Sequence, residues 1–347
     1  MAPEQTPPPS LRLAHLDNFR GLAIAMVVAT HALGYAHLPA DEQHRIAWAV
    51  QTIAVPVFFL VDGILFSLRH GTGIEFDYRG YITKSTHRLL IPWAVFTILY
   101  CLLRLIFELL GNAPAHILIG RSWQDWISAI YLSELSNQMY FLLSLFFIRV
   151  AAPPLLHLTQ SSLHTHTLVI LLYLGLFHLL PIRAWFYPGL DPIYHALWGL
   201  QFYLIGLMMP LLSRFFTSHG MAISLVTLSS GTLLPALSED MAIPAQFLIL
   251  IGSYAAFASS TAPLRLLSVL GRSTMGIYLL HIPLIMKGMA SVLSRLVPPT
   301  SLTFFLCLTI FSLIASLFLT KMLFLLPVGH QVLGEQPHGG QSDKLAR

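Results

Sequence analysis

The chain has 347 residues, of which 56% are hydrophobic and only 10% are charged, with a formal net charge of +4. A soluble globular domain carries about 25% charged residues, so this composition excludes an ordinary soluble domain and predicts an all-α, polytopic membrane protein. The small positive excess does not indicate a nucleic-acid partner, because membrane proteins gather Lys and Arg in their cytoplasmic loops.

The chain divides into two tails and one apolar domain. Residues 1–18 are polar and Pro-rich, and we expect a cytoplasmic tail there rather than a signal peptide. Residues 19–325 form the predicted transmembrane domain, and 326–347 form a second cytoplasmic tail. Apolar windows of about 17–25 residues suit helices that cross a bilayer core. In chain order the ten predicted windows are 19–38, 46–68, 89–110, 138–157, 167–183, 194–212, 221–237, 243–260, 265–287 and 301–325.

Two of these windows are irregular. The sequence "APP" at 152–154 predicts a kink or an early end in the fourth window. The ninth window begins with Gly271, Arg272 and Ser273 close to its start. The two cysteines, Cys101 and Cys307, both fall inside apolar windows, so we expect them to be packing residues rather than a disulfide.

Basic residues predict the orientation. Ten spans place both termini on one side, and that side holds 13 Lys and Arg residues against 5 on the other. Because cytoplasmic loops carry the excess of Lys and Arg, both termini are predicted to be cytoplasmic.

Several ionisable residues lie inside the apolar windows. Each costs at least about 2.5–3.5 kcal/mol at the centre of a bilayer, so such side chains face protein or water and often serve a function. The candidates are Arg20, His31, Asp62, Arg104, Glu108, His178, His195 and His281.

Arg20 and His31 are eleven residues apart, which places them on one face of a helix about 16 Å apart along its axis. This face is either one wall of a polar path from the cytoplasm, or it carries a snorkelling Arg20 and a hydrogen-bonded core His31. Asp62 lies at about the depth of Arg20, and an Arg20–Asp62 ion pair is one structural interpretation of both residues.

Two further pairs follow helical spacing. Arg104 and Glu108 are four residues apart and are expected to pair with each other. Tyr278 precedes His281 by three residues on the same face, and His281 is interpreted as either structural or catalytic.

The stretch "LDNFRGLAIAMVVATH" resembles the opening of the membrane acyltransferase 3 family, in which Leu-Asp-x-x-Arg-Gly precedes a His eleven residues after the Arg. Three more blocks resemble the family's in the same order, and "NQMYFLLSLFFI" at 137–148 is a weaker match to a Trp-Phe-Leu block. The three are "VPVFFLVDGILF" at 55–66, "HRLLIPW" at 87–93 and "GRSTMGIYLLHIPLI" at 271–285.

The resemblance implies a bacterial inner-membrane, multi-pass O-acyltransferase. Members move an acyl group, usually acetyl, from coenzyme A to a sugar hydroxyl of a glycolipid, lipopolysaccharide or exopolysaccharide. Membrane lipids and other polysaccharide-synthesis proteins are the further partners that it implies. A thioester is already activated, so no metal is expected.

The resemblance also implies roles for residues. His31 matches the motif His and would be the general base, with His281 and Tyr278 in the same catalytic site. The anionic phosphates of acetyl-CoA require cationic side chains at the cytoplasmic face, and the narrow pantetheine arm would reach His31. The residues assigned to donor binding are Arg20, Lys84, Arg88 and Asp62.

The sequence departs from the family pattern in three places. Asp62 stands where the family usually has Ser and adds a negative charge near an anionic donor. Ser85 occupies the first position of an Arg-x-x-Arg whose second position is Arg88, and Tyr140 replaces a Trp. We expect no appended extracytoplasmic domain, so the transfer finishes in the membrane domain or a partner protein receives the acyl group.

The acceptor side has its own candidates, and two other functions remain open. Aromatic and polar residues near the opposite face either bind a sugar or form an interfacial belt: Trp123, Asp125, Trp126, Trp185, Tyr187, Asp191, Tyr194 and His195.

Intramembrane charges also suit a proton-coupled transporter or a polysaccharide export subunit, although the paired halves of many transporters are not visible in the sequence. A third interpretation is a silent partner of a polysaccharide-synthesis complex.

Overall fold

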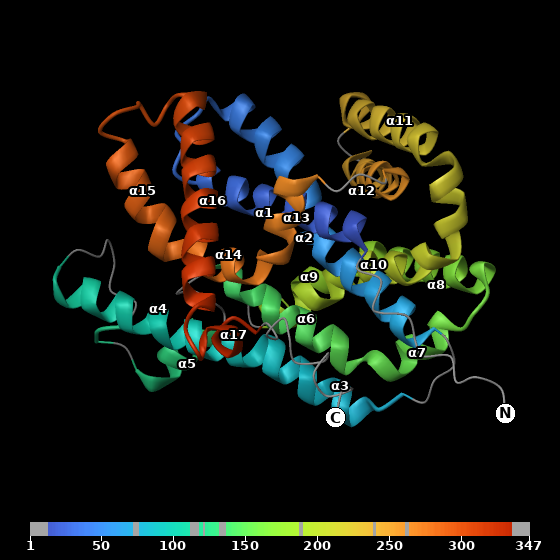
Figure 1. Cartoon of the computed structure of the whole chain (residues 1–347), viewed down its shortest axis with the longest axis horizontal. Coiled ribbons are helices and arrows are strands. Elements are labelled where there is room, and N and C mark those ends of the chain that lie inside the picture. Colours follow the sequence, from blue (N-terminus) through green and yellow to red (C-terminus); the bar gives the residue numbers. More distant parts are fainter. Residues whose placement is uncertain are drawn as a thin grey trace.

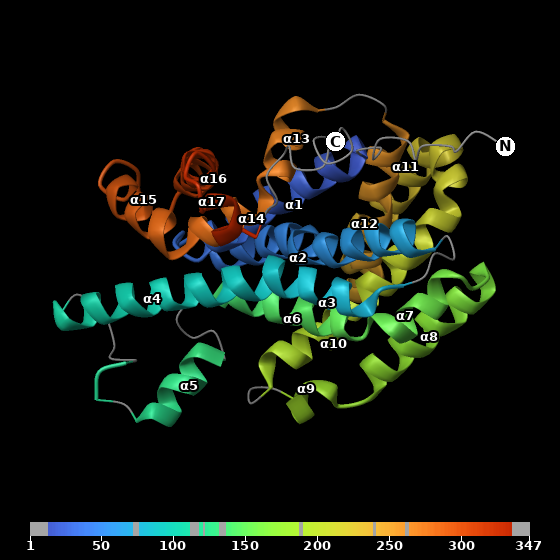
Figure 2. The same cartoon turned by 60° about the horizontal axis from the view of Figure 1, so that its bottom comes forward.

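The computed structural model describes residues 13–71, 76–111, 118–120, 122–131, 137–186, 190–238, 241–260 and 264–334, and its regular structure over these residues is helical. Figures 1 and 2 show the helices as one bundle in which α2 runs through the middle. The N-terminal half consists of α1 (Ala14–Leu33), α2 (Ala40–His70), α3 (Tyr78–Ser85), the π-helix η1 (Thr86–Leu90), α4 (Ile91–Leu109), α5 (Trp123–Tyr131), the 3₁₀-helix η2 (Asn137–Met139), α6 (Tyr140–Val150) and α7 (Ala152–Thr159).

The second half continues with longer helices and one broken one. Its elements are α8 (Leu163–Leu179), α9 (Ile182–Phe186), α10 (Asp191–Met208), the 3₁₀-helix η3 (Met209–Leu212), α11 (Ser213–Leu237), α12 (Ala242–Ser259), α13 (Arg265–Arg272), α14 (Thr274–Leu280), the π-helix η5 (His281–Ile285), α15 (Met286–Leu293), α16 (Leu302–Phe324) and α17 (Gly329–Val332). Each of the ten predicted windows coincides largely with helix.

The core of the bundle is centred on α1 and α2. α1 packs against α2, α13 and α16, and α2 packs against α10. Figure 2 shows α1 and α13 on one side of α2, with α6 and α10 on the other. The most deeply buried large side chains include Phe19 of α1, Phe59 and Leu60 of α2 and Tyr203 of α10. Asn18 of α1 and Thr52 and Ser67 of α2 are polar residues that this arrangement buries inside the protein.

Among the described residues, six helices are long and apolar enough to cross a membrane. A seventh is added if α6 and α7, which meet at a bend of 65°, form one span. That bend falls where the "APP" sequence predicts a kink. One of the six is the stretch Asp191–Pro235, which contains the predicted window 194–212 and most of the window 221–237. The protein is therefore a multi-pass helical membrane protein, and the count of ten spans stays a prediction, as do the cytoplasmic termini and tail boundaries.

The ninth predicted window does not form one helix. α13 is a separate, amphipathic helix that packs along α1, and the candidate span runs over Thr274–Leu293. Inside that span Ile282 has φ −128° and ψ 145°, so the helix is kinked at η5. The window 265–287 therefore begins too early, because an apolar run does not show where an amphipathic helix gives way to a spanning one.

Two helix crossings depend on glycines that follow charged residues. A Cβ on Gly21 would lie 2.0 Å from the carbonyl oxygen of Leu267, where α1 crosses α13. A Cβ on Gly63 would lie 2.2 Å from the carbonyl oxygen of Tyr203, where α2 crosses α10. Small residues let membrane helices approach this closely. These contacts fix the backbone beside Arg20 and Asp62, the residues that precede the two glycines.

Candidate active site

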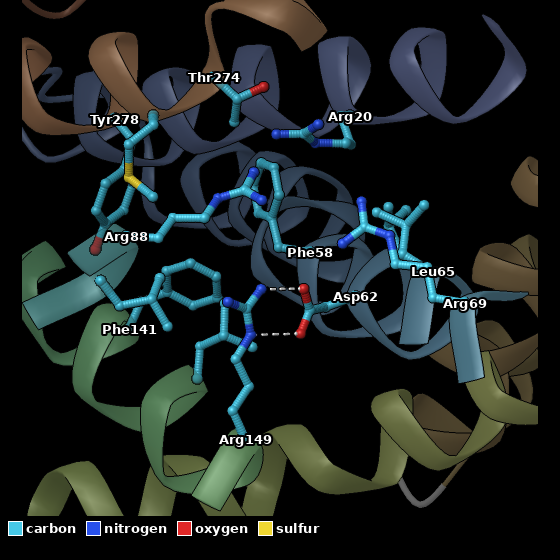
Figure 3. Close-up of a pocket in the computed structure, with 14 residues that line it drawn as sticks. Arg20, Phe58, Asp62, Leu65, Arg69, Arg88, Phe141, Arg149, Thr274 and Tyr278 are labelled. Carbon is cyan, nitrogen blue, oxygen red and sulfur yellow. Dashed lines mark hydrogen bonds and ion pairs between the residues drawn. The ribbon is translucent and has the colours of Figure 1, made fainter. Parts of the chain in front are cut away.

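A pocket of about 730 Å³, including space open to solvent, lies between α1, α2, η1, α6 and α14. Figure 3 shows four guanidinium groups that converge on it, from Arg20, Arg69, Arg88 and Arg149. The single carboxylate in its lining is Asp62. The complete lining is Arg20, Phe58, Val61, Asp62, Leu65, Arg69, Arg88, Leu89, Phe141, Leu145, Arg149, Thr274, Met275 and Tyr278. Four arginines against one carboxylate make this pocket strongly cationic.

Asp62 is held by Arg149 from the neighbouring helix. Arg149 Nε donates to Asp62 Oδ2 at 3.0 Å, and a second nitrogen of the same guanidinium donates to Oδ1 at 2.5 Å. Both side chains are mostly buried, with 11% and 16% of their surfaces exposed for Arg149 and Asp62. The ion pair that the structure forms at Asp62 is thus made by Arg149 of α6, whereas one interpretation of the sequence paired Asp62 with Arg20 of α1. The spacing of residues along one helix does not show which neighbouring helix packs against Asp62.

Arg88 lies on η1, a π-helical turn between α3 and α4. Its guanidinium interacts electrostatically with Arg149, Arg20, Asp62 and Arg69. π-Helices are rare and occur often at functional sites, because the extra residue re-aims a side chain. The turn directs Arg88 into the pocket (Figure 3). Two of the residues assigned to donor binding, Arg20 and Arg88, therefore meet Asp62 in one place.

Lys84 differs from the other residues assigned to donor binding. It is an exposed residue in the last turn of α3 and lies outside the pocket lining. Arg69 and Arg149 line the pocket instead, and neither is among the candidate residues named from the sequence. The available signal was the position of Arg149 inside the apolar run "YFLLSLFFIRV", since a charge in such a run is a functional candidate by default.

His31 and His281 form a pair, with ring centroids 5.2 Å apart. His281 is completely buried and lies at the start of η5. Its Nδ1 is 2.8 Å from the carbonyl oxygen of Tyr278 and 3.1 Å from that of Ile277. A carbonyl only accepts, so Nδ1 carries the proton and Nε2 presents a lone pair. Within the described part of the chain, Nε2 is buried and has no hydrogen-bond partner.

Tyr278 lies between the histidine pair and the cationic pocket. It lines the pocket, and its ring centroid is 6.2 Å from that of His281. Its hydroxyl donates to the backbone carbonyl of Gln138, and the Gln138 amide donates to Ile282 O at 2.8 Å. These bonds hold the broken helix against η2, the 3₁₀ turn that precedes α6. The candidate catalytic residues and the cationic pocket are thus parts of one region.

A family model described as an acyltransferase domain matches residues 13–321, nearly the whole chain. The chain belongs to this acyltransferase family. Comparisons with curated proteins and with solved structures gave no significant match. The match confirms the family resemblance, and every residue of the cationic pocket and of the histidine pair falls inside the matched range.

In this acyltransferase the remaining ionisable residues have local partners. Arg104 Nε bonds Glu108 Oε1 at 2.8 Å, as the i, i+4 spacing predicts. Glu108 also accepts from the backbone N–H groups of Leu118 and Ile119, at 3.1 Å and 3.0 Å. His178 Nε2 lies 3.3 Å from Gln201 Oε1. The Arg104–Glu108 pair therefore ties α4 to the segment after it, away from the cationic pocket.

The residues predicted for the acceptor side fall into separate groups. Trp123, Asp125 and Trp126 belong to α5, and Tyr187 lies outside the described residues. Trp185 is exposed on α9. At the start of α10, His195 Nδ1 is 3.4 Å from Asp191 Oδ1, and its ring centroid is 4.1 Å from that of Tyr140. Tyr140, which replaces the family's Trp, thus packs on a histidine that forms an ion pair when protonated.

Proposed function

We propose that this acyltransferase moves an acyl group, most simply acetyl, from acyl-CoA to a hydroxyl of a sugar on a bacterial cell-surface glycan or its lipid-linked precursor. The observation that carries the proposal is the junction at Tyr278 of the four-arginine pocket and the histidine pair. A donor with several phosphates and a long neutral arm fits a cationic pocket that adjoins a buried imidazole.

The proposed chemistry needs one base and no metal. His31 accepts the proton of the sugar hydroxyl while the sugar oxygen attacks the thioester carbonyl carbon. The tetrahedral intermediate then collapses, the carbon–sulfur bond breaks, and the coenzyme A sulfur takes the proton from the His31 imidazolium. The products are the sugar ester and free coenzyme A, so atoms and charge balance.

His281 and Tyr278 support His31 in this scheme. His281 has its Nδ1 proton engaged by backbone carbonyls, so Nε2 of the neutral ring is an acceptor. The ring of His31 lies beside it, with the two centroids 5.2 Å apart. A buried acceptor beside His31 favours the tautomer of His31 whose proton is on the side of His281 and whose lone pair faces the substrate. We therefore assign His31 as the base and His281 as a positioning residue.

Asp62, Arg20 and Arg88 form the donor site together with Arg69 and Arg149. The pocket's arginines are planar donors that bind phosphate in a bidentate manner. Convergence of Arg20, Arg88 and Tyr278 on one pocket favours an enzyme over a transporter, because a carrier does not require a phosphate-binding pocket beside a base. Lys84 contributes from outside the lining through its charge alone.

The test of this function is transfer in inverted membrane vesicles that contain the host's native glycans. Radiolabelled acetyl-CoA is added to the exposed cytoplasmic face, and label is measured on glycan and glycolipid. The proposal predicts label that depends on the protein. Vesicles that transport a glycan but never acquire label would support the export or transporter function instead.

A further inference from the structure

The fork of Arg149 is the best-formed anion-binding group in the pocket, and it is already occupied. Two guanidinium nitrogens bind the two oxygens of Asp62 at 3.0 Å and 2.5 Å. This is the geometry in which an arginine binds a phosphate. Asp62 thus stands at the place where a phosphate oxygen would otherwise bind, inside a pocket that holds three further arginines.

The electrostatics of the pocket point the same way. Among the described residues, the charged groups that line the pocket are four guanidinium groups and one carboxylate. The carboxylate neutralises Arg149 and repels an incoming phosphate. Both effects weaken the pocket's hold on an anion. A site of four arginines without this carboxylate would bind a multiply charged donor, and its equally charged product, more tightly.

We propose that Asp62 limits the affinity of this pocket for phosphate-bearing ligands by competing for Arg149, and so keeps the product's release fast. Product release sets the turnover of many enzymes, and free coenzyme A carries the same phosphates as acyl-CoA. The inference rests on the proposed function only in that coenzyme A is the expected ligand. A phosphorylated lipid-linked acceptor has the same chemistry and is distinguished by the experiment.

The test compares wild type with Asp62→Asn and Asp62→Ser in lipid nanodiscs. Asp62→Asn keeps the shape of the side chain and one hydrogen bond to Arg149, so this variant is expected to fold. The matched control is Asp41→Asn, which removes the same charge from the same helix about 31 Å away along its axis. The probes are coenzyme A, inorganic pyrophosphate and an isoprenyl phosphate in the nanodisc, with pantetheine as the phosphate-free reference.

The expected result is that Asp62→Asn binds a phosphate probe about tenfold more tightly than wild type, as the loss of one nearby negative charge allows. Asp41→Asn and the pantetheine reference should show no change. If coenzyme A is the tightened probe, its dissociation rate also falls. If only the isoprenyl phosphate binds more tightly, Asp62 does limit phosphate affinity, but coenzyme A is not the donor. Folded Asp62→Asn that binds no phosphate probe more tightly than wild type overturns the inference.

Discussion

The imidazole rings of His31 and His281 lie with their centroids 5.2 Å apart, although His31 lies in the last turn of α1 and His281 begins the π-helical turn η5. His281 is completely buried, and its Nδ1 proton is directed at backbone carbonyls of α14. The kink at Ile282 immediately follows His281. This arrangement makes the broken helix a means of fixing an imidazole beside the first helix.

The histidine pair predicts a graded effect of substitution at His281. His281→Gln keeps an acceptor but loses the ring, and we expect kcat for acyl transfer to fall by about ten- to a hundredfold with little change in the KM for acyl-CoA. The range lies below the loss of about 10²–10⁴ for a general base itself. Steady-state kinetics in nanodiscs measures both constants. A large rise in KM with unchanged kcat would instead place His281 in donor binding.

The cationic pocket predicts that Arg88→Ala weakens donor binding. Loss of one charge-assisted bond to a phosphate costs about 1.5–3 kcal/mol, so the KM for acyl-CoA should rise about tenfold or more. Arg79→Ala is the matched control, since Arg79 is an exposed arginine of α3 outside the lining. Lys84→Ala should have a smaller effect than Arg88→Ala. Equal KM values for Arg88→Ala and Arg79→Ala would contradict the donor site.

The close crossing of α2 and α10 predicts that a side chain at Gly63 lowers the stability of the fold. Gly63→Ala places a Cβ 2.2 Å from the carbonyl oxygen of Tyr203, so the helices must move apart. Overpacking of this kind costs about 1–3 kcal/mol, and thermal stability in detergent should fall. Gly175→Ala is the control, because nothing lies within 4 Å of a Cβ there. A Gly63→Ala protein as stable as Gly175→Ala would show that the crossing is looser than described.

The Arg104–Glu108 pair predicts a loss of stability without a loss of donor affinity. Arg104→Gln removes the guanidinium charge that pairs with the buried Glu108 carboxylate, which also accepts from the backbone N–H groups of Leu118 and Ile119. We expect reduced thermal stability and an unchanged KM for acyl-CoA, because neither residue lines the cationic pocket. Enzyme assays at a temperature where both proteins are folded separate the two effects. A raised KM in the folded variant would argue that this pair acts on the donor.

Local spacing predicted the features that depend on a single helix. The Arg104–Glu108 pair and the bend at 152–154 follow from i, i+4 geometry and from proline chemistry. The family resemblance added the expectation that blocks distant in the chain form one site, and the match over residues 13–321 confirms the family.

Residue spacing along the chain does not predict contacts between helices. Asp62 is bound by Arg149 of α6, a partner that depends on how α2 and α6 pack. Likewise, His31 meets His281 directly before the kink at Ile282 in η5, which an apolar run does not display. The start of the ninth window was placed too early for the same reason, since α13 packs on α1 as a separate amphipathic helix.

The most direct test of the central claim is acetyl transfer by wild type, His31→Ala and His37→Ala in the same inverted vesicles. His37 is an exposed histidine just beyond α1 and controls for loss of an imidazole. The account predicts that label reaches glycan or glycolipid with wild type and His37→Ala, and that His31→Ala loses at least about a hundredfold while its expression and folding stay intact. Near-normal labelling by folded His31→Ala would contradict His31 as the base.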